Sequence, residues 1–134
     1  MQFKPRKPLQ FWEQSVVNDY RKFPADIQDD GGYQLDRLQQ GLDPDDFKPM
    51  AVIGAGAFEL RLRDDSNAYR VIYVVKFEDA VWVLHAFQKT TQKTSNKDIQ
   101  LAKERFAKLL QLKSEEKALQ KKTARKTASG KTAS

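Results

Sequence analysis

Residues that could bind an anion and transfer a proton gather in one stretch of the chain, residues 58–93. The side chains of interest there are Arg61, Arg63, Arg70, His85, Lys89 and Lys93, with Glu59 and Phe87 beside them. Guanidinium groups bind phosphate oxygens through paired hydrogen bonds, histidine titrates near neutral pH, and aromatic rings stack on bases. This combination indicates an anion-binding site, with RNA among its candidate ligands.

The same stretch predicts the strands that would position these side chains. Residues 58–63 alternate apolar and charged side chains with a period of two, which is typical of a strand with one buried and one wet face. Turn-forming residues follow at 64–67, and further strands are expected over residues 68–77 and 80–88, on either side of a tight turn at 78–79. The result is an antiparallel meander.

The first turn decides which residues of the meander lie opposite each other. If Arg63 pairs with Ala68, Arg61 lies directly opposite Arg70. Like charges in that position repel, so the pair indicates that an anion binds between the two side chains. The alternative is that nearby acidic residues neutralise them, namely Glu59, Asp64 or Asp65.

The second turn extends the same face. If Lys76 pairs with Val81, Phe87 lies opposite Arg70, and His85 follows two residues away on the same side. One face then carries Arg61, Arg63, Arg70, His85, Phe87 and Lys89, with Glu59 beside them. The other face is expected to be the core and carries Leu60, Leu62, Tyr69, Val71, Tyr73, Val75, Phe77, Trp82, Leu84 and Ala86. For His85, the alternative is a half-buried strand residue without a chemical role.

Helical patterns flank the meander. Residues 16–23 repeat apolar positions at helical spacing, and Pro24 suits the first turn of a second helix with Ile27, Leu35, Leu38 and Leu42 facing the core. Gly31 and Gly32 indicate either a break in that helix or close packing of its backbone. Residues 9–12 fit an edge strand or a helix entry, and residues 50–53 fit a short strand.

A third helix is expected after the meander. Ser95 and Asp98 have capping-box spacing, and the apolar stripe behind them is Ile99, Ala102, Phe106, Leu109 and Leu110. The predicted fold class is therefore α+β. A small antiparallel sheet of three to five strands, with a central meander, packs with two N-terminal helices and a C-terminal helix.

Composition narrows the function classes. Without cysteine, and with one histidine, disulfides and thiolate sites are excluded and a histidine metal site is a poor expectation, so no metal and no cofactor is predicted. The chain has no long apolar run and no signal-peptide pattern, which predicts a cytoplasmic protein without a membrane partner.

The net charge of +6 is concentrated at the C-terminus. Residues 113–134 hold seven Lys/Arg and two Glu, a net charge of +5, which leaves +1 for residues 1–112. The Lys/Thr/Ala/Ser repeats of this segment cannot bury enough apolar surface to fold. We therefore expect one domain over residues 1–112 and a basic, disordered tail over residues 113–134.

Several segments together resemble a known family. They are residues 58–61 (FELR), 68–73 (AYRVIY), 84–89 (LHAFQK), 91–94 (TQKT) and 98–105 (DIQLAKER). In order and spacing they resemble the phage-derived, HigB-like branch of the RelE toxin superfamily. The resemblance implies the toxin of a type II toxin–antitoxin module, with a helix-turn-helix antitoxin as cognate partner. It also implies a metal-independent endoribonuclease that cleaves mRNA, often on the ribosome, and so inhibits translation.

The resemblance also implies roles for individual residues. Arg70 matches the phosphate-contacting arginine of the family, and Arg61 matches a basic position on the preceding strand. Because histidine titrates nearest neutrality, His85 is the first candidate for proton transfer, with Glu59 as the alternative base and Lys89 as the acid. The residues expected to contact RNA are Arg63, Phe87 and Lys93, and a packing role is the alternative for Phe87.

Two other function classes stay open. One is a non-catalytic RNA-binding or partner-binding module that uses the same basic face, and weak general acid–base equipment favours it. The other is a phage structural or accessory protein whose basic face docks an acidic partner. A neighbouring gene for a small helix-turn-helix protein would favour the toxin over both.

Overall fold

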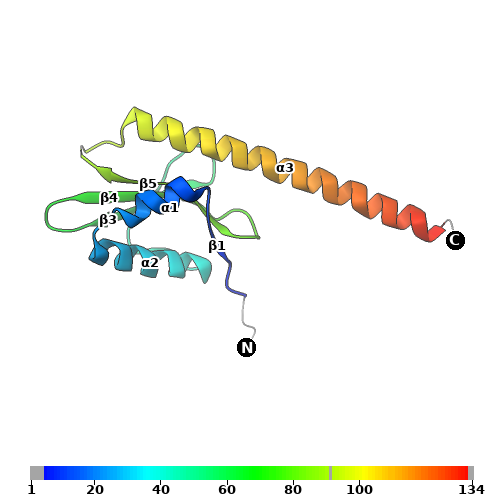
Figure 1. Cartoon of the computed structure of the whole chain (residues 1–134), viewed down its shortest axis with the longest axis horizontal. Coiled ribbons are helices and arrows are strands. Elements are labelled where there is room, and N and C mark those ends of the chain that lie inside the picture. The colour runs from blue at the N-terminus through cyan, green and yellow to red at the C-terminus, as the bar shows by residue number, and fades with distance from the viewer. Residues whose placement is uncertain (1–4, 91, 133–134) are drawn as a thin grey trace.

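The computed structural model describes residues 5–90 and 92–132, which form one five-stranded sheet and three helices (Figure 1). In chain order the elements are β1 (Leu9–Phe11), α1 (Gln14–Arg21), α2 (Ala25–Gln39), β2 (Phe47–Pro49), β3 (Ala57–Arg63), β4 (Ala68–Val74), β5 (Val81–Lys89) and α3 (Asn96–Thr132). The strand order is β1-β5-β4-β3-β2. The α+β class and the helix arrangement are confirmed, but the sheet is mixed, because β1 pairs with β5 in parallel.

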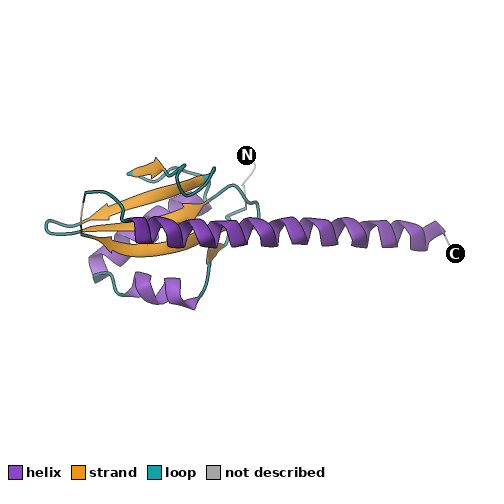
Figure 2. Cartoon of the chain, turned by 90° about the horizontal axis from the view of Figure 1, so that it is seen from above, coloured by secondary structure: helices purple, strands orange, loops and turns teal. Residues whose placement is uncertain are grey.

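Helices cover both faces of the sheet, so the single core expected from the sequence is in fact two apolar clusters (Figures 1 and 2). The cluster under α1 and α2 includes Val16, Ile27, Leu35, Leu38, Leu60, Leu62, Tyr69, Val71 and Tyr73. The cluster under α3 includes Ile72, Val74, Leu84, Ala102, Phe106 and Leu109. The face that carries the arginines is therefore buried over one part of its length and open over another.

The register between β3 and β4 is confirmed, with Arg61 opposite Arg70 and Arg63 opposite Ala68. Between β4 and β5 the expected pair of Arg70 and Phe87 also forms. Closer to the second turn the register shifts by one residue, between Ile72 and Tyr73, so the pairing assumed at that turn is wrong. Such a bulge places an extra residue in one strand and changes which face the following side chains occupy.

The bulge has a direct consequence for the cores. Leu84, fully buried, packs in the cluster under α3, and Trp82 and Phe77 pack against the same cluster. The alternation rule had assigned all three to the opposite face. Because both faces of the sheet are apolar at this end, the chain accommodates the shift without exposing an apolar side chain.

Close packing, not a helix break, explains Gly31, the first of the paired glycines of α2. A Cβ on Gly31 would lie 2.5 Å from the Tyr20 hydroxyl and 3.1 Å from Leu62 Cδ1, whereas Gly32 faces open space. The Tyr20 hydroxyl donates a hydrogen bond of 2.6 Å to the Gln28 carbonyl, which fixes α1 against α2. Gly31 thus lets α2 approach β3.

The end of α2 corrects the expected role of Leu42, which lies outside the helix and is 46% exposed. Gly41 has a φ of 83°, and the amides of Gly41 and Leu42 donate to the carbonyls of Leu38 and Arg37. This is a Schellman motif, which ends the helix at the glycine. The strand expected over residues 50–53 is also misplaced, since Phe47–Pro49 forms it and residues 51–53 form a turn.

The capping prediction for α3 is confirmed: the Asp98 amide donates to Ser95 Oγ over 3.2 Å, and the Ser95 hydroxyl donates to Asp98 Oδ2 over 2.6 Å. The helix then continues to Thr132 and projects past the sheet (Figures 1 and 2). The sequence predicts an unfolded tail from about residue 113, whereas residues 113–132 continue this helix, and residues 133 and 134 lie outside the described residues. Residues 114–124 are indeed exposed, but their Lys, Glu, Gln and Ala side chains are good helix formers on an already nucleated helix.

Candidate functional site

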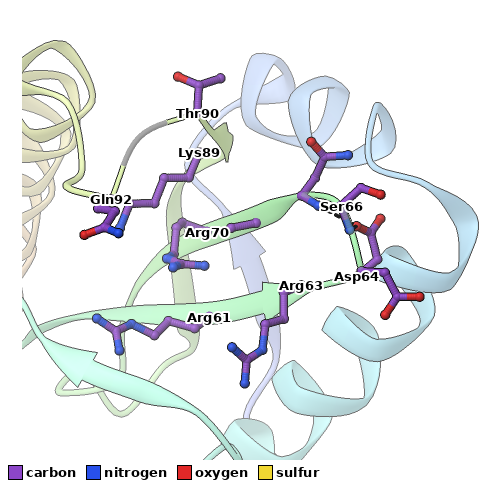
Figure 3. A pocket seen from close by; sticks show the side chains of 11 residues that line it. Arg61, Arg63, Asp64, Ser66, Arg70, Lys89, Thr90 and Gln92 are labelled. Atoms are coloured by element: carbon purple, nitrogen blue, oxygen red, sulfur yellow. Dashed lines mark hydrogen bonds between the residues drawn. The ribbon is translucent and has the colours of Figure 1, made fainter.

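A cleft of about 840 Å³ lies at the end of the sheet next to the β3–β4 turn (Figure 3). The cationic residues of its wall are Arg61 and Arg63 from β3, Arg70 from β4 and Lys89 from β5. The rest of the wall is Asp64, Asp65, Ser66 and Asn67 of the turn, Ala68 at the start of β4, and Thr90 and Gln92 beyond β5. Because α3 covers only the other end of this face, the predicted arginine cluster stays open to solvent.

Glu59 lies beside the arginine pair. Its Oε1 is 3.3 Å from Nε of Arg70 and 3.8 Å from Nε of Arg61, and neither Nε makes a hydrogen bond. The Glu59 side chain is 1% exposed. The repulsion that the register predicts between the two arginines is thus offset by one shared buried carboxylate, as the alternative reading of the sequence held.

The two arginines differ in exposure. The Arg70 side chain is 12% exposed, that of Arg61 33%, and Arg70 also donates from Nη1 to the Tyr69 carbonyl over 3.0 Å. Burial lowers the pKa of Arg70, Glu59 opposes this, and Arg61 adds to it. The pKa of an arginine stays far above neutral pH even when burial lowers it, so Arg70 keeps its positive charge in the cleft.

Lys89 places an ammonium group in the cleft, and the pKa of that group is lowered. Desolvation lowers the pKa of its ammonium, and the charge of Arg70 lowers it further. A lysine with a lowered pKa gives up its proton more readily than a solvated one, which suits proton transfer. Figure 3 shows Lys89 beside Arg70.

His85 is buried away from the cleft, in a network with α3. Its Nε2 is 2.7 Å from Asp98 Oδ1, and its Nδ1 is 3.3 Å from Arg105 Nη1. Since arginine can only donate, Nδ1 accepts, and Nε2–H donates to Asp98. Burial lowers the pKa of His85, and Asp98 opposes the shift. The structure therefore does not place His85 beside the arginines of the cleft.

Phe87 and Lys93 also lie outside the cleft wall. Phe87 is half-buried opposite Arg70, and its ring stacks on that of His85 with centroids 4.8 Å apart. Lys93 is exposed on the loop between β5 and α3. Of the eight candidate residues, the structure thus brings four into the cleft and Glu59 directly behind it.

Sequence reasoning missed the residues that hold this arrangement in place. Thr94 donates its hydroxyl to Glu59 Oε2 over 2.7 Å, and Arg105 donates to the Leu84 carbonyl over 2.8 Å. The sequence could have indicated a role for Arg105, because Asp98 and Arg105 are seven residues apart and so lie on the same face of the helix. Nothing in the sequence marks Thr94.

Two further findings concern the part of the chain that the structure describes. No helix there is both long enough and apolar enough to cross a membrane. No group of three or more His, Cys, Asp or Glu side chains is placed to hold a metal ion among those same residues.

A comparison with protein families finds a match over most of the chain. Residues 18–107 match the family described as "Phage derived protein Gp49-like (DUF891)". The matched region runs from α1 into the buried part of α3, so it includes the cleft and leaves out the projecting part of α3. No curated protein and no solved structure matches the chain.

Proposed function

We propose that this chain, which belongs to the Gp49-like family of phage-derived, toxin-like proteins, is the toxin of a type II toxin–antitoxin module that cleaves mRNA without metal. The observation that carries the proposal is the cleft, where four cationic side chains from three adjacent strands meet. A phosphodiester is the ligand that such a set of guanidinium and ammonium groups fits best.

The proposed chemistry is transesterification within the RNA. The 2′-hydroxyl gives its proton to a water molecule of the open cleft, and its oxygen attacks the adjacent phosphorus and forms a bond to it while the bond from phosphorus to the 5′-oxygen breaks. The 5′-oxygen takes up a proton, and the products are a 2′,3′-cyclic phosphate and a 5′-hydroxyl. Arg61 and Arg70 bind the phosphate and stabilise the charge of the pentavalent transition state.

Lys89 is the proposed acid that protonates the 5′-oxygen, because it lies in the cleft and its pKa is lowered there. His85 and Glu59 are the bases that the sequence suggests, but neither side chain lines the cleft. This distribution favours Lys89 as the group that gives a proton to the substrate, and the ammonium then takes up a proton from solvent. Arg63, Lys93 and Phe87 are proposed to contact the RNA on either side of the cleaved bond.

The partners follow from the same proposal. The substrate is mRNA, free or on the ribosome in the cytoplasm, and a cognate helix-turn-helix antitoxin neutralises the toxin. Since the cleft is basic, the part of the antitoxin that covers it should be acidic.

A non-catalytic RNA-binding module is the second candidate function. The observation that favours it is the burial of His85 in its network with Asp98 and Arg105, which leaves Lys89 as the candidate proton-transfer residue that lines the cleft. Such a module would bind RNA through the same arginines without cutting it.

Induced expression in a bacterium distinguishes the two candidates. The toxin should arrest growth, and mapped mRNA fragments should begin with a 5′-hydroxyl. Co-expression of the neighbouring helix-turn-helix gene should restore growth. Growth arrest with intact mRNA would instead support the binding module, and normal growth would reject the toxin.

A further inference from the structure

Glu59 joins three parts of the candidate site that are far apart in the sequence. One oxygen of its carboxylate, Oε1, faces the Nε atoms of Arg61 and Arg70, at 3.8 and 3.3 Å. The other, Oε2, accepts the hydroxyl of Thr94 over 2.7 Å. Thr94 belongs to the loop between β5 and α3, the loop that also supplies Gln92 to the cleft wall. A single buried carboxylate therefore connects β3, β4 and this loop.

The contacts of the two arginines leave some of their terminal Nη groups for a ligand. Both Nε atoms are buried beside Glu59, within ion-pair distance of Oε1 but without a hydrogen bond to it. Arg70 uses Nη1 for the Tyr69 and Leu62 carbonyls, so Nη2 of Arg70 and the Nη groups of Arg61, which also lines the cleft, are the donors that remain for a phosphate. Without the carboxylate, two cations held opposite each other on neighbouring strands would repel and separate.

We propose that Glu59 is a positioning residue, which with Thr94 forms a brace that aligns Arg61 and Arg70, and that it is not the general base. The inference rests on the proposed function, because alignment matters only if the arginines act on a phosphate. A base must come within about 3 Å of the hydroxyl that it deprotonates. Glu59 is 1% exposed and its two oxygens face the arginines and Thr94.

The brace predicts a separation between binding and turnover. Glu59→Gln removes a negative charge from beside the cleft, which favours any anion, while it also frees the arginines to move. Affinity for a non-cleavable 2′-deoxy oligonucleotide should therefore change less than about threefold. The cleavage rate should fall about a hundredfold, which is the typical cost of a misplacement of roughly 1 Å.

The first test needs no RNA. In ¹⁵N spectra of the full chain, the buried Nε–H groups of Arg61 and Arg70 should give signals protected from solvent exchange. Glu59→Gln and Thr94→Val should both lose that protection, and Thr94→Ser, which keeps the hydroxyl, should retain it. Unchanged signals in Thr94→Val would overturn the brace, even if Glu59→Gln fails to fold.

The second test is the pH profile of cleavage. A general base gives the rate an acidic limb that disappears when the base is replaced. For a positioning residue, Glu59→Gln lowers the whole profile and leaves its shape unchanged. Loss of the acidic limb, with the arginine signals still protected, would make Glu59 the base. If the wild-type chain cleaves no RNA, the proposed function fails, and the exchange measurement still decides whether the brace exists.

Discussion

Arg70 has two roles: it is proposed to bind the substrate phosphate, and it neutralises the buried carboxylate of Glu59. An alanine at this position would leave a buried carboxylate 3.8 Å from its remaining arginine, and such a loss costs about 3 kcal/mol of folding free energy. Loss of activity in Arg70→Ala would therefore not by itself identify a site residue. A substitution that keeps the charge is needed.

We expect Arg70→Lys to keep the unfolding free energy within about 1 kcal/mol and to lower RNA cleavage at least a hundredfold, because lysine cannot bind a phosphate with two parallel hydrogen bonds. Arg63→Ala is the matched control, since Arg63 is an exposed arginine in the same cleft. It should weaken RNA binding only modestly and leave stability unchanged. Full activity in a folded Arg70→Lys would remove Arg70 from the site.

The lowered pKa of His85 predicts that the stability of the fold depends on pH. Its pKa in the folded protein lies below the usual 6.5, so the unfolded chain binds a proton that the folded chain resists. Stability should be complete above about pH 6.5 and fall as the pH drops, by at most about 1.4 kcal/mol per pH unit. Burial is the largest cause of the lowered pKa; of the charged groups around the ring, Asp98 and Asp19 favour the proton and Arg105 opposes it.

Urea unfolding of the wild type and of His85→Gln between pH 5 and 7.5 measures this contribution. The variant should lose part of the pH dependence, since glutamine does not titrate. An identical slope in both proteins would mean that His85 is not held neutral by its network.

At the scale of elements, the approach of α2 to β3 depends on one glycine of a neighbouring pair. Gly31→Ala should destabilise the fold by about 1–3 kcal/mol, because its Cβ would meet the Tyr20 hydroxyl at 2.5 Å. Gly32→Ala, facing open space in the same helix, should stabilise it by up to about 1 kcal/mol. Thermal unfolding of the two variants checks the pair, and equal effects would contradict the packing assigned to Gly31.

The projecting part of α3 is proposed as a non-specific contact for nucleic acid. Replacing the exposed residues Lys117, Lys121 and Lys122 with glutamine should weaken RNA binding at about 50 mM salt, and the difference should fade above about 0.2 M. The matched control replaces Lys97, Lys103 and Lys108, exposed lysines on the part of α3 that packs on the sheet. Equal losses in both triple variants would leave the projection without a special role.

Elements that repeat a simple pattern could be predicted from the sequence. The alternation of residues 58–63 and the turn at 64–67 were enough to place Arg61 opposite Arg70. The bulge near Leu84 was not predictable, since both faces of the sheet are apolar there and the pattern gives no preference for either register. Neither was the parallel pairing of β1, a strand of three residues with no alternation to read.

At the scale of the whole molecule, the candidate site was predictable as a charge cluster but not as an arrangement. Periodicity brought four cations to one end of one face. It could not show that α3 buries His85 at the other end, because that contact joins β5 to residues beyond the meander. It also could not show that Thr94 reaches Glu59, a contact between residues 35 positions apart.

The molecule consists of a packed body, formed by the sheet and the helices on it, and the exposed projecting part of α3. The family match ends near the point where α3 leaves the body. This agrees with a functional domain close to residues 1–112, which stays a prediction. Lys113 lies where α3 leaves the body, because its Nζ lies over the rings of Phe77 and Trp82 and pairs with Asp79. The proposed chemistry should therefore depend on the body alone.

The most direct measurement of the central claim, that the arginine cleft cleaves RNA without metal, is the chemistry of the product ends. The full chain is mixed with a defined mRNA, free in EDTA and bound to ribosomes in magnesium buffer, beside Arg70→Lys. The account predicts 5′-hydroxyl and 2′,3′-cyclic phosphate ends from the wild type, and intact RNA from the variant. Ends with a 5′-phosphate and a 3′-hydroxyl, no cleavage in either setting, or equal cleavage by Arg70→Lys would contradict it.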